Sequence, residues 1–251
     1  MLMTIDVGNT NISVGIYEND KFITSFRLTT QSSRTSDEFA GEFYSLMQVK
    51  NLKAEMIKNV IISSVVPNLN HSLQSAVKKY FKADPLFVSL KLNTGIKTKI
   101  KDLGADRIVD LVAAKEYYGP EVLVLDFGTA TTYDYIDKDS NFVLGVTAPG
   151  IGIEADALTS RAAQLPKIEI RKPESIITHD TIGSMQAGVV YGYIGSVEYI
   201  IDQIHEELHK DFRVIATGGL GSIIVPWTKK IEVYDPDLAY KGMKLIWEKN
   251  H

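Results

Sequence analysis

The sequence predicts an α/β protein made of two similar domains. Short runs of buried-strand residues alternate with longer helical patterns along the 251 residues. Two of the strands end alike, with an acid, a glycine and small polar residues: "TIDVGNTN" at residues 4–11 and "VLDFGTAT" at residues 124–131. A strand end that recurs in each half indicates a duplicated unit.

The composition is that of an ordinary globular protein, with 45% hydrophobic and 23% charged residues. The net charge of −4 gives no electrostatic basis for binding nucleic acid. The chain has no apolar run of about 18 residues and no signal-like start, so we expect a cytoplasmic protein that does not enter membranes. Because there are no cysteines, disulfides and thiolate metal sites are excluded.

The first half should open with three strands, at residues 3–6, 12–17 and 22–28, separated by polar turns. A helix is expected to begin at Ser36, which two acids follow. The later elements of this half are a strand at 59–66, a helix at 69–81, a strand at 96–101 and a helix from about 106 to Gly119. The strand at 96–101 places Lys97, Lys99 and Lys101 on one face. That face is either a solvated sheet edge or a rim that attracts an anionic ligand.

The second half repeats the strand, turn and strand order. We expect strands at 121–128, 214–219 and 231–234, a helix entered from the loop at 149, a long helix over 181–210 and a last helix from about 236 to the end. No low-complexity linker separates the halves, so the predicted domains are residues 1–118 and 119–251.

An offset of 120 residues superimposes the two halves. It aligns Asp6 with Asp126, Gly8 with Gly128, Ile16 with Ile136 and Phe22 with Phe142. Four identities in a matching order favour duplication, and chance similarity of two hairpins is the alternative.

Both strand ends are suited to bind phosphate, because a tight turn of glycine and small polar residues can point backbone N–H groups at an anion. Thr10 with Asn9 and Asn11 supplies polar groups at the first turn, and Thr129, Thr131 and Thr132 supply them at the second. Two such turns on duplicated domains would hold a polyphosphate across a cleft. Asp6 and Asp126 would repel phosphate, so a cation is expected between them and the anion. Alternatively, each aspartate only hydrogen-bonds its own turn.

Asp106 is the candidate base. It follows Gly104 and Ala105, precedes Arg107 and opens a helix whose N–H groups favour a carboxylate. Near a phosphate site it could accept the proton of an attacking hydroxyl. The plainer interpretation is ordinary helix-start chemistry.

Other nucleotide motifs are absent: neither a P-loop nor a complete Gly-x-Gly-x-x-Gly occurs. Gly218 and Gly219 follow a buried strand and indicate a close backbone approach. The approaching group is either a flat ligand such as adenine or a neighbouring helix.

Together, "DVGNTN", "GADR", "DFGTATT", "PG" at Pro149, "DTIGSMQAG" and "ATGG" resemble type III pantothenate kinases, of the acetate and sugar kinase, chaperone ATPase and actin superfamily. The resemblance spans nearly the whole chain. It implies a duplicated ribonuclease H-like (actin-like ATPase) fold with a nucleotide cleft between two similar domains. It also implies a cytoplasmic homodimer that phosphorylates pantothenate to 4′-phosphopantothenate at the start of coenzyme A synthesis, with ATP, Mg²⁺ and K⁺ or NH₄⁺.

The resemblance also assigns roles to residues. It makes Asp106 the general base and Asp6 the residue that positions Mg²⁺ through water, and gives K⁺ or NH₄⁺ to Asp126. The remaining nucleotide contacts would be Val7, Gly8, Asn9, Thr10, Asn11, Ile12, Ser13 and Thr129. Gly218 and Gly219 are added as candidate nucleotide contacts from their own pattern, if the group that approaches them is adenine. The remaining pantothenate contacts would be Gly104, Ala105, Arg107 and Thr181.

The chain departs from the family pattern at one place. Family members commonly carry Tyr-x-Asn-Pro shortly before Gly-Ala-Asp-Arg, whereas "GIKTKIKDLGADR" is about three residues shorter and lacks the tyrosine and the proline. The lysines of residues 97–101 are candidates to replace that contact. Alternative functions are a kinase of the same fold for another small hydroxylated acceptor, and a non-catalytic nucleotide-binding regulator.

Overall fold

The computed structural model describes residues 1–251, which form two compact units. Unit 1 comprises Met1–Ala113 and Asp237–His251, and unit 2 comprises Ala114–Pro236. The chain passes from unit 1 to unit 2 within a few residues of the predicted limit at 118, and its last segment returns to unit 1. The domain limits 1–118 and 119–251 stay a prediction.

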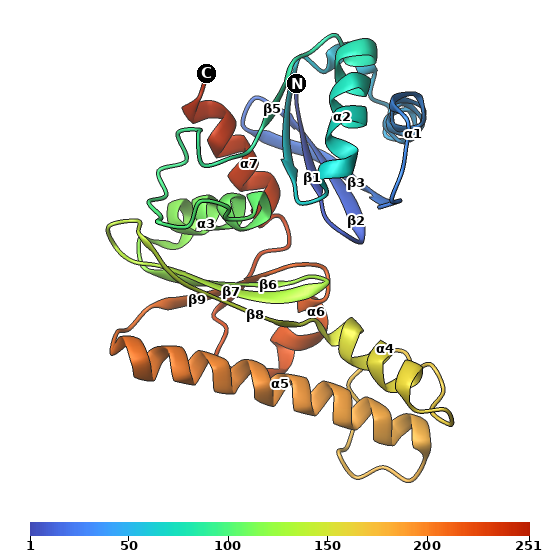
Figure 1. Ribbon diagram of the computed structural model, residues 1–251, viewed down its shortest axis with the longest axis vertical. Helices are drawn as coiled ribbons and strands as arrows, with labels where there is room; N and C mark the ends of the chain where they lie inside the picture. Colours follow the sequence, from blue (N-terminus) through green and yellow to red (C-terminus); the bar gives the residue numbers. More distant parts are fainter. The chain divides into compact units, whose positions relative to one another are not determined.

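Unit 1 is built on a five-stranded mixed sheet in the order β3-β2-β1-β4-β5 (Figure 1). The strands are β1 (Leu2–Val7), β2 (Asn11–Glu18), β3 (Lys21–Thr29), β4 (Asn59–Ser64) and β5 (Pro85–Phe87). β1, β2 and β3 pair antiparallel, whereas β4 and β5 run parallel to β1. The first three strands confirm the predicted opening.

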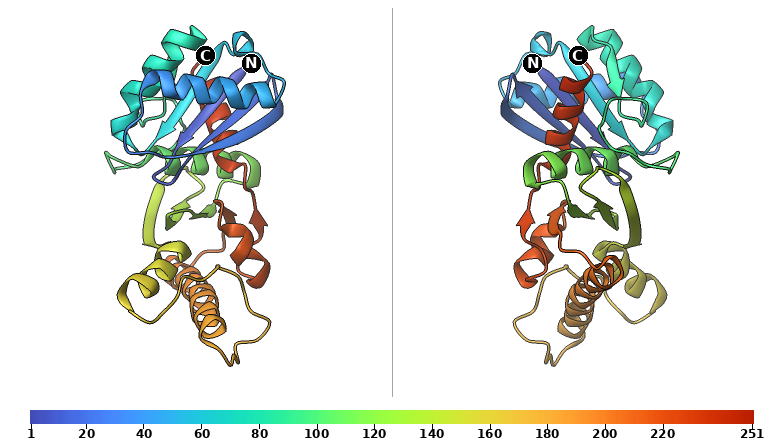
Figure 2. Two further views of the ribbon diagram at one scale, coloured as in Figure 1. Left: turned by 90° about the vertical axis from the view of Figure 1, so that its right-hand side faces the viewer. Right: turned by 90° about the vertical axis from the view of Figure 1, so that its left-hand side faces the viewer.

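Two helices cover one face of this sheet, and a third covers the other. α1 (Ser36–Val49) and α2 (Pro67–Ala76) bury the face that carries Met3, Ile5 and Val7. α7 (Leu238–Lys249) packs against β1 and β4 on the opposite face. The two views of Figure 2 show α1 in front of the sheet from one side and α7 from the other. A short 3₁₀ turn, Ala54–Met56, precedes β4.

Local chemistry explains where these helices begin and end. Thr35 accepts a hydrogen bond from the Glu38 N–H at 3.3 Å, and Glu38 accepts one from the Thr35 N–H at 2.7 Å, which forms a capping box. α1 therefore begins at Ser36, as predicted. α2 starts at Pro67, which lacks an N–H to satisfy. It continues as a π-helical turn, Val77–Phe81, and ends at Lys82 in the left-handed conformation.

Unit 2 has a second mixed sheet, in the order β10-β9-β6-β7-β8. Its strands are β6 (Val122–Phe127), β7 (Ala130–Ile136), β8 (Phe142–Pro149), β9 (Arg213–Thr217) and β10 (Val233–Tyr234). The helices are α4 (Ile151–Arg161), α5 (Thr181–Leu208), the short α6 (Gly221–Ile224) and a 3₁₀ turn, Val225–Trp227. α5 buries its apolar stripe against β6, β7 and β9 (Figure 1). No helix has the length and apolar character needed to cross a membrane.

The two sheets share one topology, which confirms the predicted duplication. β6, β7, β8, β9 and β10 repeat β1, β2, β3, β4 and β5 in order and direction. Tyr17 pairs with Leu2 of β1, and Ile136 pairs with the equivalent residue of β6, Val122. The equivalent of Ile136 is therefore Tyr17 and not Ile16. The second turn is one residue shorter than the first, so the offset along β7 is 119 and the identity of Ile16 with Ile136 is coincidental.

The predicted strand at 96–101 is wrong. Residues 91–103 form no strand apart from one bridge at Lys97. The Thr94 hydroxyl accepts the Ile96 N–H at 3.2 Å, and the Thr98 hydroxyl accepts the Ile100 N–H at 3.0 Å. These local side-chain turns occupy N–H groups that a strand ladder would use. The helix α3 (Ala105–Tyr118) follows, in the predicted place.

Candidate functional site

Asp6 lies one residue before the end of β1, beside two serines. In the strand register it is opposite Ser13 of β2 and Ser63 of β4. Directly opposed residues project from the same face of a sheet. Asp6, Ser13 and Ser63 therefore share the face that α7 covers, and Val7 projects into the core on the other face.

The turn after Asp6 is held by hydrogen bonds within itself and from Thr30, the residue after β3, and its tip is exposed. The Gly8 N–H donates to the Asn11 carbonyl at 3.0 Å, and the Thr30 hydroxyl donates to the Gly8 carbonyl at 2.7 Å. Asn9, Thr10 and Asn11 are exposed. Val7 and Ile12 are buried, so only their backbone groups could contact a phosphate.

The Asp6 carboxyl is in an environment that resists its charge. Burial raises its pKa, and the nearby Asp106 carboxylate raises it further, to about 7. The Ser63 hydroxyl and the Arg27 guanidinium act in the opposite direction. A cation at this position would relieve the repulsion between the two acids.

Asp106 is fixed at the first turn of α3. Its Oδ1 accepts the Arg107 N–H at 2.8 Å. A Cβ on Gly104 would lie 2.5 Å from the same oxygen, so a larger residue there would displace the carboxylate from this position. Burial raises the pKa of Asp106, and the Arg107 N–H bond and charge partly offset this effect. A partly buried carboxyl with a raised pKa is suited to act as a base near neutral pH.

The structure thus brings Asp6, Ser13, Asp106 and the turn at 8–11 into one part of unit 1. It adds Arg27, Ser63 and Tyr240, which the sequence analysis did not identify. The sequence could have indicated Ser63, because this residue lies near the carboxyl end of a buried strand, as Asp6 does. It could not have indicated Tyr240, because no sequence feature shows that the last helix returns to β1.

Unit 2 has the equivalent turn, built around Asp126 at the end of β6. The Gly128 N–H donates to the Ala130 carbonyl at 3.1 Å, and the Gly150 N–H donates to the Thr129 carbonyl at 3.1 Å. A Cβ on Gly150 would lie 2.4 Å from that carbonyl oxygen. The "PG" motif is therefore packed directly on the turn, and the Thr129 side chain is exposed.

Gly218 meets the same turn from β9. Its φ of +89° is a conformation that favours glycine, and a Cβ would lie 2.3 Å from Asp126 Oδ1. The close approach inferred from the sequence is therefore to Asp126 and Phe127 of the adjacent strand, rather than to a helix. A contact of Gly218 and Gly219 with adenine stays a prediction.

Two threonines of unit 2 lie in contrasting environments, and only Thr131 differs from expectation. Thr131 is fully buried, and its hydroxyl bonds to that of Tyr193 on α5, so it is not available to phosphate. Thr181 is the exposed first residue of α5, after the N-cap Asp180, whose carboxylate accepts the Gly183 N–H at 2.8 Å.

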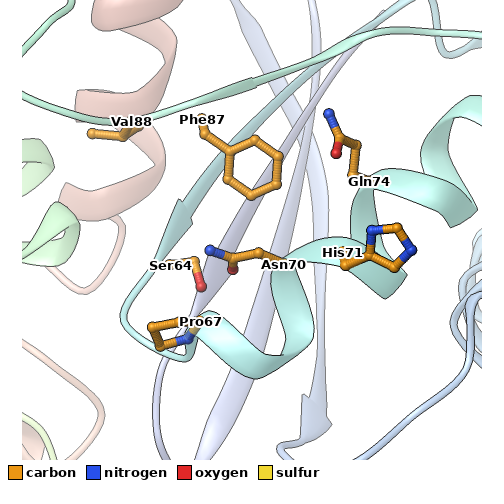
Figure 3. A pocket seen from close by; sticks show the side chains of 7 residues that line it. All are labelled: Ser64, Pro67, Asn70, His71, Gln74, Phe87 and Val88. Carbon is orange, nitrogen blue, oxygen red and sulfur yellow. The ribbon is translucent and has the colours of Figure 1, made fainter.

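A polar cavity of about 460 Å³ lies elsewhere in unit 1 (Figure 3). Its lining is Ser64, Pro67, Asn70, His71, Gln74, Phe87 and Val88. Ser64 is opposite Val7, so it projects from the face that α1 and α2 cover, away from Asp6. The lining includes no carboxylate and no arginine or lysine, so this cavity does not contain the candidate base.

The two strand-end acids suit hard cations. No group of three or more histidine, cysteine or acidic side chains could enclose a metal. Mg²⁺ keeps several waters and binds through one or two carboxylates together with substrate phosphates. Asp6, with a charge that its surroundings resist, fits that pattern, and Asp126 beside Thr217 of β9 offers oxygen donors to a monovalent cation.

Solved structures share this fold at low identity. An inorganic polyphosphate/ATP-glucomannokinase from Arthrobacter sp. strain KM is 14% identical, with a TM-score of 0.53 over 100% of this chain and 99% of that chain. The ethanolamine utilization protein EutJ from Carboxydothermus hydrogenoformans is 14% identical, with a TM-score of 0.57 over 97% and 89%. These similarities confirm the predicted actin-like ATPase fold.

Sequence comparison is more specific. The family model for type III pantothenate kinase matches residues 2–203. A type III pantothenate kinase of Agathobacter rectalis is 50% identical, covering 100% of this chain and 98% of the relative. One of Bacillus cytotoxicus is 43% identical, covering 100% and 97%. The chain therefore belongs to the type III pantothenate kinase family.

Proposed function

We propose that the chain transfers the γ-phosphate of ATP to the primary hydroxyl of pantothenate, which yields 4′-phosphopantothenate and ADP, in the first step of coenzyme A synthesis. The observation that carries the proposal is Asp106. Its carboxylate is fixed at the start of α3, and its charge acts on Asp6 at the end of β1. Family membership supplies the identity of the acceptor.

In this reaction Asp106 accepts the proton of the attacking hydroxyl. The new O–P bond forms as the bond to the β–γ bridging oxygen breaks, and ADP leaves with those electrons. The turn at residues 8–11 offers N–H groups and polar side chains to the phosphates. Mg²⁺, held by Asp6 through water, would neutralise phosphate charge. Gly104, Ala105 and Arg107 would contact pantothenate, and Arg107 suits its carboxylate.

Residues of unit 2 would complete the nucleotide and acceptor contacts. Asp126 would hold K⁺ or NH₄⁺, Thr129 the phosphates and Thr181 pantothenate. Gly218 and Gly219 are the proposed contacts of the adenosine end. The support is the duplicated geometry of the two turns and the exposure of Thr129 and Thr181.

We propose that the protein is a homodimer. α5 exposes Ile182 and Tyr199, with 48% and 65% of their surfaces accessible, although its other face fills the core of unit 2. The homodimer rests on the family resemblance, and this long helix is the element that we propose at its interface. Lys97, Lys99 and Lys101 are exposed, which suits them to attract the anionic acceptor in place of the missing tyrosine.

The test is ADP release with Mg·ATP, measured with and without pantothenate and with and without K⁺ or NH₄⁺. We expect release to require both additions. Asp106→Asn keeps the shape of the side chain but cannot accept the proton, so turnover should fall by about 10²-fold or more while ATP binding remains. Release with other hydroxylated acids alone would indicate a different acceptor. ATP binding without any release would indicate a regulator, and normal turnover of Asp106→Asn would remove this residue from the mechanism.

A further inference from the structure

A row of four polar side chains crosses the first sheet at the level of Asp6. Arg27 of β3 is opposite Ser13 of β2, Ser13 is opposite Asp6 of β1, and Asp6 is opposite Ser63 of β4. Opposed residues share a face, so the four project on the side that α7 covers. Arg27 is the positively charged member of the row.

Arg27 reaches toward Asp6 along this row. Its Nε donates to the Ser13 hydroxyl at 3.2 Å. Ser13 also bonds to the hydroxyl of Tyr240 on α7, so two elements fix this serine beside Asp6. Arg27 and Asp6 thus flank Ser13 on the same face of the sheet, on the two strands that adjoin β2.

The second sheet has the same row without the cation. Thr147 of β8 is opposite Thr132 of β7, Thr132 is opposite Asp126 of β6, and Asp126 is opposite Thr217 of β9. Three hydroxyls and a carboxylate therefore suffice to build this part of the fold. The arginine is specific to the unit that also carries the candidate base.

We propose that Arg27 is a positioning residue of the phosphotransfer site, which orients Ser13 and supplies the positive charge that lets Asp6 and Asp106 share one site. This inference rests on the proposed function for its catalytic consequence. Arg27 would act through Asp6, and the proposal assigns it no contact with the acceptor. Because its side chain is exposed, its removal should change folding stability little.

One experiment observes Asp6 directly in the ligand-free protein, whatever the acceptor. Aspartate is labelled with ¹³C at the side-chain carboxyl, and the Asp6 resonance is assigned from its absence in Asp6→Asn. We expect Arg27→Met to move this resonance and to leave that of Asp126 in place. The control is Lys21→Met, which removes an exposed cation from the other end of β3. An Asp6 resonance that moves no more in Arg27→Met than in Lys21→Met would overturn the proposal.

A double-mutant cycle tests the catalytic consequence. Arg27→Met should lower kcat by about tenfold or more, with the KM for pantothenate changed less than about twofold, and Arg27→Lys should recover much of the loss. In the Asp6→Asn background the same substitution should lower kcat less than about twofold. An equal loss in both backgrounds, or no loss in either, would contradict action through Asp6. If the parent protein releases no ADP with pantothenate, the proposed function fails, and the resonance of Asp6 still decides the role of Arg27.

Discussion

Asp6 and Asp106 show how a functional site opposes the stability of the folded chain. Each carboxyl has a raised pKa because burial disfavours its charge, and the Asp106 charge adds to the effect at Asp6. The sequence could identify both residues, since each follows or precedes a glycine at the end of an element. It could not show that their charges interact, because they are far apart in the sequence and only the packing within unit 1 brings the start of α3 near the end of β1.

Asp106→Asn should stabilise the ligand-free protein increasingly as pH rises. A folded-state pKa above the unfolded value of 3.8 means that the folded protein binds more protons, so wild-type stability falls as pH rises through that interval. Asparagine does not titrate and can still accept the Arg107 N–H. The Tm difference, variant minus wild type, should therefore grow in scanning calorimetry as pH rises above the unfolded pKa of 3.8.

Asp37→Asn is a control of opposite sign. Hydrogen bonds from Lys79, at 2.8 Å, and Tyr80, at 2.6 Å, lower the pKa of Asp37. Its ionised form stabilises the folded state above the unfolded pKa, and that contribution is lost as pH falls through the lowered value. The Tm of this variant should thus fall relative to wild type as pH rises. A Tm difference for Asp106→Asn that is independent of pH would contradict the environment described for Asp106.

At the scale of elements, hydrophobic periodicity predicted the helices and strands that apolar packing stabilises. It failed where side chains hydrogen-bond the neighbouring backbone. β1, α1 and α5 carry uninterrupted apolar patterns, and they form where those patterns indicated. Residues 96–101 also alternate, but Thr94 and Thr98 bind backbone N–H groups that a strand would need. Ile100 is 45% exposed, so its burial adds little that would favour a strand.

The crossing of α3 and α7 depends on Gly242. A Cβ at this position would lie 1.9 Å from the Val109 carbonyl oxygen and 2.6 Å from its carbon, so neither helix backbone could accommodate it. Gly242→Ala gains about 1 kcal/mol of helix propensity, but forced separation of two packed helices costs about 1–3 kcal/mol and often more. We expect net destabilisation by urea unfolding. Turnover should fall too, because Asp106 lies one helical turn from Val109.

Gly41→Ala is the matched control for this clash. Gly41 is an exposed residue within α1, and nothing lies within 4 Å of its missing Cβ. Only the higher helix propensity of alanine then matters, and Gly41→Ala should stabilise the protein by up to about 1 kcal/mol. If both variants were stabilised to a similar extent, the close contact of Gly242 with Val109 would not exist in solution.

At the scale of the whole chain, duplication was visible in the sequence because each half must end its first strand with the same acid and turn. The return of the last helix to unit 1 was not visible. An amphipathic pattern shows that α7 has an apolar face, but not which sheet it covers. Only the structure shows that residues from both ends of the chain form unit 1.

This arrangement predicts that a chain ending at Pro236 loses the fold of unit 1 and keeps that of unit 2. α7 buries Leu238, Met243 and Ile246 completely, each worth about 1.5–3 kcal/mol, so their loss removes much of the 5–15 kcal/mol that typically stabilises a domain. The core of unit 2 contains no residue of α7. Hydrogen exchange should show protection in β6, β7 and α5 and little in β1 and β4. A chain that ends at Lys249 retains α7 and should keep both patterns, whereas protected β1 amides in the shorter chain would show that unit 1 does not need its C-terminal helix.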